Sequence, residues 1–344
     1  MIGRQVLEVS KLQLPVKTIQ RHASSQSKVE RFTLTADSAP TFPRHFLATG
    51  VHCGVKKNPK QLDLGLIVSS SPYPTSSAAC FTKNAFQAAP VQVCKAVLKE
   101  SPTARALVVN SGCANAVTGS KGLEDAWAMA QAVNDLFGSN SAASQNLPKM
   151  STLVMSTGVI GQKLPMQRIL PSLRSSCLPT LSSSFESWDA AARAFMTTDT
   201  FPKLRTKECK IPGREQPIRF VGIDKGAGMI HPNMAPHATM LGMIATDATI
   251  GPKALQSALT YATNRSFNSI SVDGDMSTND TVVAMANAAA WEGYDEIVAG
   301  EEGWVEFRDS LTEFATELAG LIVWDGEGAT KFVSISVEVS FKGC

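Results

Sequence analysis

Short apolar runs that end at polar or glycine-bearing turns recur along the chain. Residues 62–67 carry leucine and isoleucine ahead of a Ser-Ser-Pro turn signal, a pattern that predicts a strand. Residues 106–109 and 152–155 are mostly apolar and of strand length. Each of these two runs predicts a buried strand followed by a loop, at 110–112 and at 156–158. We therefore expect a sheet built from short strands.

Three longer segments show helical spacing. In residues 123–137 apolar side chains recur every three or four positions, and Gly138 is well placed to end that helix. Residues 252–264 and 303–322 also predict helices, and the polar stretch 139–147 predicts a loop. Because short strands alternate with helices, the pattern favours a layered α/β architecture.

Residues 225–248 differ from the other segments because their apolar residues follow neither a helical nor a strand periodicity. The stretch contains four Met, three Gly and two Pro between apolar flanks. Such a composition predicts a loop in which the backbone can take unusual geometry.

Composition and charge exclude several classes of protein. The 344 residues are enough for one large domain or two ordinary ones, and 44% of them are hydrophobic. This fraction can form a substantial core and is not typical of disorder. A net charge of +2 gives no reason to expect a nucleic-acid or anionic-membrane partner. No apolar run approaches the roughly 18–20 residues of a membrane helix, so we expect a soluble protein.

The metal-ligating residue types are scattered. None of the seven cysteines forms a CxxC pair, and the five histidines show no HxxxH spacing. Free thiols in a reducing compartment are the expected state, and we expect no metal and no cofactor. Asp273 and Asp275 form a lone DxD, which favours loop support over a metal site.

The first 31 residues differ in charge from the rest. They carry six basic residues, two acidic ones and a serine-rich stretch at 24–27, and they lack an apolar h-region. Their positive excess is larger than the net charge of the whole chain, so the remaining residues are net negative. This start is typical of a mitochondrial transit peptide; the alternative is an ordinary disordered N-terminus.

Seven segments occur in a fixed order between about residue 46 and about residue 335. They are FTKNAFQAAPV from Phe81, NSGCANAVTG from Asn110, STGVIGQKLPM from Ser156, TTDTFPK from Thr197, KGAGMIHPNM…ATML from Lys225, SVDGDMSTND from Ser271 and DGEGATK from Asp325. Together they resemble the ornithine acetyltransferase (glutamate N-acetyltransferase) family of arginine biosynthesis. The resemblance implies a layered α/β sandwich like that of the N-terminal-nucleophile aminopeptidases.

The resemblance also implies how the chain is divided. Residues 1–43 are expected to be a transit peptide and disordered leader, 44–238 an α chain and 239–344 a β chain, the last two forming one fold. The self-cleavage point is the bond between Ala238 and Thr239. The family continues well beyond residue 344, so the chain is expected to be a form truncated at its C-terminus.

The family's nucleophile corresponds to Thr239. A threonine hydroxyl attacks a carbonyl poorly unless a nearby base takes its proton. Cleavage before Thr239 frees an α-amine, whose ordinary pKa is about 7.7–8.0, beside that hydroxyl. The resemblance therefore implies an acetyl-Thr239 intermediate.

Five further positions match the family's site. Thr157 and Gly158 match the oxyanion site, which supplies a hydroxyl and a backbone N–H to the developing negative charge. Lys225 and Glu327 match substrate-binding positions, and their charges complement a carboxylate and an ammonium. Thr197 matches a hydrogen-bonding partner, although its neighbour Thr198 is an alternative.

The implied activity is transfer of acetyl from N-acetylornithine to glutamate in the mitochondrial matrix. Some members also accept acetyl-CoA, and the family suggests a heterotetramer of two α and two β chains. No nucleic-acid or membrane partner is implied.

One departure from the family pattern leaves rival hypotheses open. Three residues, 236–238, interrupt the family's PNMATML sequence, and a proline near the scissile bond restricts the backbone. The rivals are a self-processing amidase or aminopeptidase, in which water takes the acyl group, and an inactive fragment that only binds or regulates.

Overall fold

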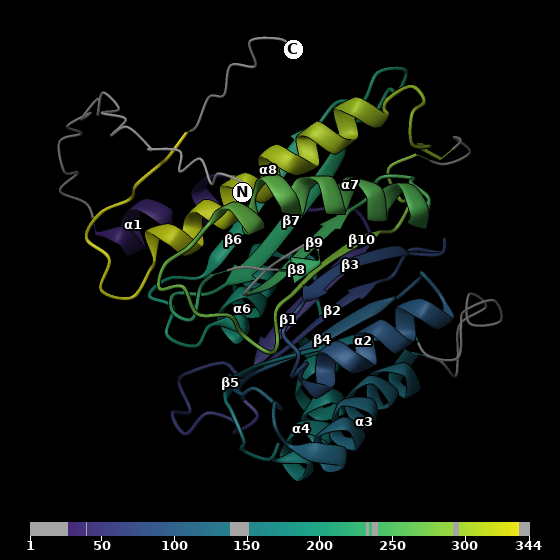
Figure 1. Ribbon diagram of the computed structural model, residues 1–344. Helices are drawn as coiled ribbons and strands as arrows, with labels where there is room; N and C mark the ends of the chain where they lie inside the picture. Colours follow the sequence, from purple (N-terminus) through teal and green to yellow (C-terminus); the bar gives the residue numbers. More distant parts are fainter. Residues whose placement is uncertain are drawn as a thin grey trace, which may run out of the picture.

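The computed structural model describes residues 27–38, 40–137, 151–231, 234–235, 240–291 and 296–336. Two sheets form the centre of the molecule (Figure 1). The four-stranded sheet has the order β1-β2-β4-β5, with β1 Phe46–Val51, β2 Leu64–Ser69, β4 Ala106–Cys113 and β5 Thr152–Val159. The six-stranded sheet has the order β6-β7-β9-β10-β3-β8, with β6 Lys203–Cys209, β7 Ile218–Lys225, β9 Leu241–Thr246, β10 Thr281–Ala286, β3 Ser76–Thr82 and β8 Met234–Ala235.

Helices cover the outer faces of the two sheets (Figure 1). On the six-stranded sheet lie α7 Pro252–Arg265 and α8 Trp304–Trp324. The outer face of the four-stranded sheet packs against α2 Ala89–Glu100 and α3 Gly119–Phe137, whereas α6 Phe185–Phe195 contacts both sheets. Shorter helices are α1 Lys28–Phe32, α4 Met166–Ser172 and α5 Leu178–Thr180. The expected layered α/β architecture is confirmed.

Strand β10 shows how the two cores are divided. All six of its residues are buried, and successive side chains point to opposite faces of the sheet. Val283 and Met285 belong to the core between the sheets, whereas Val282 and Ala284 belong to the core beneath α7 and α8. Because both faces are covered, the strand reads in sequence as a continuous apolar run.

The strands and helices predicted from sequence are present, but some bounds differ: the strand predicted at 62–67 is β2, Leu64–Ser69, and β4 and β5 extend beyond the predicted runs. The helices predicted at 252–264 and 303–322 are α7 and α8, and α3 begins at Gly119, four residues before the predicted start. The loop predicted at 139–147 and its helix-ending Gly138 lie outside the described residues.

The loops predicted at 110–112 and 156–158 are wrong. Strands β4 and β5 continue as a parallel pair to Cys113 and Val159, with an irregularity of register at Gly112 and Cys113. The glycines have positive φ, 105° at Gly112 and 127° at Gly158, so they allow the pair to bend without ending it.

The aperiodic stretch 225–248 is only partly a loop. Residues 241–246 form β9, which is buried along its whole length between β7 and β10. Its short apolar run is of the kind that predicted β4 and β5, but the glycines, prolines and methionines around it hid that pattern.

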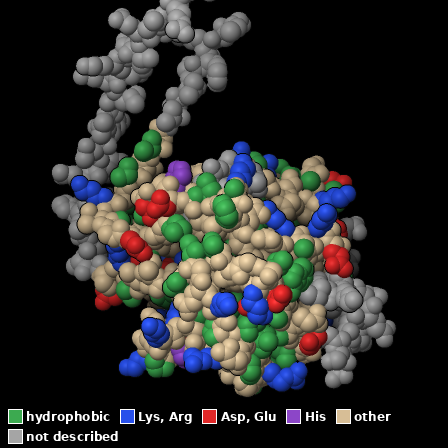
Figure 2. Space-filling view, turned by 60° about the horizontal axis from the view of Figure 1, so that its bottom comes forward, with side chains coloured by type: hydrophobic (Ala, Val, Ile, Leu, Met, Phe, Trp, Pro, Cys, Tyr) green, Lys and Arg blue, Asp and Glu red, His purple; other side chains and the backbone are tan. Residues whose placement is uncertain are grey.

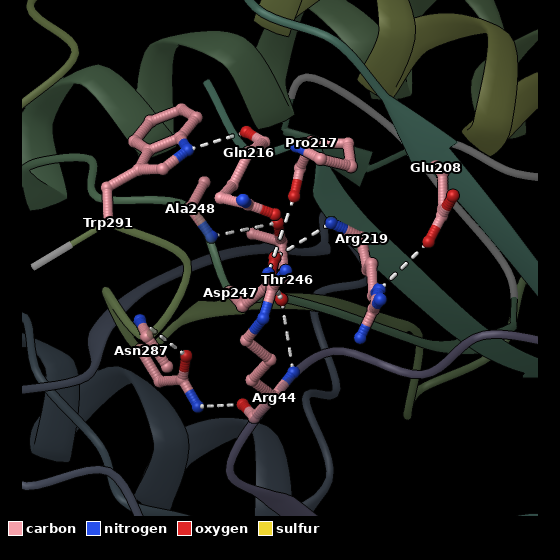
Figure 3. A network of polar contacts seen from close by, with 11 residues as sticks. Arg44, Glu208, Gln216, Pro217, Arg219, Thr246, Asp247, Ala248, Asn287 and Trp291 are labelled. Carbon is pink, nitrogen blue, oxygen red and sulfur yellow. Dashed lines mark hydrogen bonds and ion pairs between the residues drawn. The ribbon is translucent and has the colours of Figure 1, made fainter. Parts of the chain in front are cut away.

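Arg44 is tied to the ends of three strands of the six-stranded sheet. The Asp247 carboxylate accepts hydrogen bonds from Arg44 N (3.1 Å), Arg44 Nη1 (2.9 Å) and Arg219 N (2.7 Å) (Figure 3). Asn287 Nδ2 donates to the Arg44 carbonyl at 2.9 Å. This network joins the incoming chain to the ends of β7, β9 and β10.

Part of the expected leader contacts the folded body. Phe32 of α1 stacks on Phe201 with ring centroids 5.6 Å apart, and Phe42 stacks on Trp188 at 5.4 Å. The structure therefore differs from the expectation of a disordered leader up to residue 43, because these aromatic rings gain apolar contacts. Residues 1–26 and 39 lie outside the described part of the chain.

The distribution of surface charges and the state of the cysteines agree with what the composition predicts. Acidic and basic side chains are interspersed on the face shown in Figure 2. None of the helices in the described ranges is long and apolar enough to span a membrane. The six cysteines that the structure describes are free thiols, five of them buried.

Candidate active site

A cavity of about 670 Å³ lies where the ends of the two sheets meet. Residues of β4 and β5 line one side, and the ends of β7 and β9 line the other. Each of the five described residues that the sequence singles out for binding or oxyanion stabilisation lines this cavity: Thr157, Gly158, Thr197, Lys225 and Glu327. The structure thus brings together residues that are up to 170 positions apart in sequence.

The Thr157–Gly158 pair depends on a close approach of two strands. A Cβ on Gly158 would lie 2.4 Å from the carbonyl carbon of Gly112, a backbone atom that cannot move aside easily. Thr157 is 9% exposed, and its Oγ1 is 3.3 Å from Lys225 Nζ, which donates to it. Because the hydroxyl accepts this hydrogen bond, its own hydrogen is available to another acceptor.

Lys225 ends β7 and points into the cavity. Burial lowers the pKa of Lys225, and the Asp199 carboxylate opposes this effect. Lys203 lowers the pKa further, whereas Asp280 and Glu327 raise it. The carboxylates around Lys225 therefore favour the charged form of its side chain.

Glu327 lies at the exposed side of the cavity. Its backbone N–H donates to the carbonyl of Ala227 at 2.7 Å, which holds the segment after α8 beside the segment after β7. A Cβ on Gly228 would lie 2.7 Å from Glu327 Cδ, so glycine makes room for this carboxylate.

Thr197 and Thr198 both line the cavity, and Thr197 is the more buried of the two. Thr197 N donates to Asp199 Oδ2 at 2.8 Å, which fixes the backbone of this loop. The choice of Thr197 as the substrate partner stays a prediction.

The predicted nucleophile and cleavage bond, Thr239 and Ala238, lie outside the described residues, as do Pro236 and His237. The two residues that follow, Met240 and Leu241, line the cavity. Leu241 is opposite Lys225 on one neighbouring strand and Thr281 on the other.

The Asp273 carboxylate supports a loop, as expected. It accepts hydrogen bonds from the backbone N–H groups of Met229 (2.6 Å), Ile230 (2.8 Å) and Asp275 (3.1 Å). In the part of the chain that the structure describes, no three His, Cys, Asp or Glu side chains are grouped as metal ligands.

Comparison with known proteins shows the family. The sequence profile of the ArgJ family matches residues 47–342. The chain belongs to the ArgJ family. It is 56% identical over 311 residues to "Arginine biosynthesis bifunctional protein ArgJ, mitochondrial" of Postia placenta, a match that covers 86% of this chain and 65% of the relative. The protein of the same name from Laccaria bicolor is 55% identical over 308 residues, covering 87% and 64%.

The chain therefore spans slightly less than two thirds of the length of these ArgJ relatives. A crystal structure of ArgJ from Bacillus halodurans is 38% identical, with a TM-score of 0.49 and coverage of 56% of this chain and 92% of that chain. The family assignment rests on the sequence matches.

Sequence reasoning missed Lys56, which also lines the cavity of this ArgJ-family chain. Its Nζ donates to the carbonyls of Leu62 and Met196, each at 2.7 Å. Burial lowers the pKa of Lys56 to about 8, against the opposing effect of Asp63. In sequence Lys56 belongs to a Lys-Lys pair that resembles exposed surface, so no signal distinguished it.

Asn279 was missed as well. Its Nδ2 donates to the carbonyls of Ala114 (2.6 Å) and Ser156 (2.8 Å), which ties the loop before β10 to the ends of β4 and β5. It stands inside the SVDGDMSTND motif, so the motif itself was the available signal.

Proposed function

We propose that this chain is an acetyltransferase that moves acetyl from N-acetylornithine to glutamate through Thr239, after self-cleavage at the Ala238–Thr239 bond. The observation that carries the proposal is the cavity that joins Thr157, Lys225 and Glu327 and is lined by the residue after Thr239. Membership of the ArgJ family supports the same activity.

The first half-reaction follows from the chemistry of these groups. The Thr239 hydroxyl oxygen bonds to the acetyl carbonyl carbon, and its proton passes to the new α-amine. Thr157 Oγ1–H and Gly158 N–H stabilise the oxyanion. The carbon–nitrogen bond then breaks, ornithine takes up the proton, and acetyl remains as an ester on Thr239.

The second half-reaction reverses these steps with a different amine. The glutamate amine attacks the ester carbonyl, its proton returns to the Thr239 oxygen, and N-acetylglutamate leaves. Lys225 pairs with the α-carboxylate that both substrates carry, and Glu327 pairs with the side-chain ammonium of ornithine. Thr197 donates a hydrogen bond to the substrate.

The experiment follows labelled acetyl from N-acetylornithine in the presence of glutamate. We expect N-acetylglutamate, ping-pong kinetics, and no transfer by Thr239→Ala. Free acetate with no N-acetylglutamate would favour the amidase hypothesis. No transfer and no cleavage into two chains would favour the inactive-fragment hypothesis.

Further parts of the proposal concern the second donor and the assembly. The relatives are named bifunctional, which supports acetyl-CoA as an additional donor to glutamate. We also propose that α and β chains assemble as a heterotetramer. Replacing N-acetylornithine by acetyl-CoA in the same assay tests the donor, and sedimentation tests the assembly.

The proposed location is the mitochondrial matrix. The basic leader and the mitochondrial names of the relatives support it. A fusion of residues 1–43 to a fluorescent protein should enter the matrix, and diffuse cytosolic fluorescence would contradict this.

A further inference from the structure

A buried group of three charges borders the cavity. Lys203 Nζ donates to Asp199 Oδ1 and to Asp325 Oδ2, both at 2.6 Å, and all three side chains are 0% exposed. We call Asp199, Lys203 and Asp325 the ion triple. A buried charge is strongly destabilising unless its partners compensate for the lost contacts with water. The further hydrogen bonds of the ion triple show what it holds in place.

Among the described residues, the two carboxylates also accept hydrogen bonds from the loop before β6 and from the segment after β7. Asp199 accepts from the backbone N–H groups of Thr197 and Gly226, both at 2.8 Å. Asp325 accepts from Thr200 N at 2.9 Å and from Thr200 Oγ1.

The ion triple therefore joins three segments that carry proposed substrate contacts. Thr197 is bonded directly, Lys225 precedes the bonded Gly226, and Glu327 follows Asp325 by two residues. These segments come from the loop before β6, the end of β7 and the end of α8. A shift of any one would separate the groups that must contact one substrate.

The ion triple has a net charge of −1, because two carboxylates share one ammonium. Asp224 is opposite Lys203 on the neighbouring strand, and burial raises the pKa of its carboxyl well above the usual range. This negative charge faces Lys225, which is also influenced by Asp280, Glu327 and the Lys56 ammonium.

We propose that the ion triple positions the segments of Thr197, Lys225 and Glu327 around one substrate, and that its Asp199 carboxylate supplies a negative charge beside the Lys225 ammonium, which pairs with a substrate carboxylate. These are positioning residues, because they act on substrate through other groups. The substrate part of this inference rests on the proposed function, whereas the charge on Lys225 does not.

The test is an NMR titration of protein with ¹³C-labelled lysine, in which the Lys225 signal is identified by its loss in Lys225→Met. Asp199→Asn keeps the size of the side chain and removes its charge. We expect it to lower the pKa of Lys225, because the Asp199 carboxylate raises that pKa. The Kd for N-acetylornithine should rise about tenfold, because the Thr197 and Lys225 segments lose the charge that joins them; calorimetry measures this Kd.

Asp247→Asn is the matched control. Asp247 is also 0% exposed and also accepts backbone N–H groups, but it follows the other end of β9 from the cavity. It should leave the titration of Lys225 and the Kd unchanged. Asp199→Asn protein that folds and behaves like this control would overturn the inference.

Thr200→Ala keeps the test decisive if Asp199→Asn does not fold. Thr200 is exposed, and this change removes its hydroxyl hydrogen bond to Asp325. The Kd for N-acetylornithine should rise several-fold. An unchanged Kd would overturn the positioning role. Failure of the proposed function is distinguishable, because it would appear as absent acetyl transfer in the unmodified chain while the Lys225 titration still responds to Asp199→Asn.

Discussion

At the scale of single residues, Gly158 is the position in the cavity at which the backbone most clearly requires glycine. Its φ of 127° and the 2.4 Å approach of a would-be Cβ to the Gly112 backbone both exclude a side chain. We expect Gly158→Ala to lower kcat for acetyl transfer about 100-fold or more, because the oxyanion donor is displaced. Steady-state kinetics on the cleaved protein measures this.

Gly161→Ala is the control for backbone strain alone. Gly161 also has positive φ, 77°, but nothing lies within 4 Å of its added Cβ. This variant should lose about 1–3 kcal/mol of stability and little activity. An equal loss of kcat in both variants would mean that strain, and not the close approach, matters.

Lys225 predicts a pH dependence. Burial lowers its pKa, so the ammonium loses its proton at lower pH than an exposed lysine. Affinity for the substrate carboxylate should be full below this pKa and should fall as the pH rises through it. Calorimetry with N-acetylornithine from pH 7 to 10 measures the fall, and a Kd that stays constant to pH 10 would contradict the assigned role.

What could be predicted at this scale followed from the motifs. Thr157, Lys225 and Glu327 stand in matched segments, and the structure brings them to one cavity. Lys203 stands in a matched segment too, yet its role depends on carboxylates that come from two other places in the fold. Only the packed structure shows that a lysine is buried between them.

At the scale of elements, sequence located helices better than strand ends. In α7 and α8 the apolar residues recur with a helical period of 3.6 residues, because one face of each helix is buried and the other is exposed to solvent. Strands β4 and β5 run past the glycines where we expected loops, since a parallel pair can continue through a local irregularity. Polar and glycine residues at that point serve the cavity and do not mark a turn.

The Arg44–Asp247 contact gives a prediction about stability. Asp247 is 0% exposed, so removing the Arg44 side chain leaves part of a buried carboxylate unpaired. We expect Arg44→Met to lower the free energy of unfolding by about 1–3 kcal/mol and to leave the cavity intact. Denaturant unfolding gives the first quantity and substrate affinity the second.

Lys207→Met is the comparison, because the Glu313 partner of Lys207 is 75% exposed. This pair should contribute less than about 1 kcal/mol. Equal losses in the two variants would show that burial does not decide the strength of these contacts.

At the scale of the whole molecule, the proposed cleavage falls inside a shared sheet. Strands β9 and β10 follow Thr239, yet they lie between β7 and β3, which precede it. We expect the two chains to remain together after cleavage, because separation would break the ladders of β9 with β7 and of β10 with β3. They should co-elute on gel filtration and separate only in denaturant; separation under native conditions would contradict this arrangement.

The most direct measurement of the central claim is the intact mass of each chain after the cleaved protein meets N-acetylornithine without glutamate. The account predicts one added acetyl group on the chain that begins at Thr239, and its loss when glutamate is supplied. An unmodified mass for that chain, or acetyl on the other chain alone, would contradict the account.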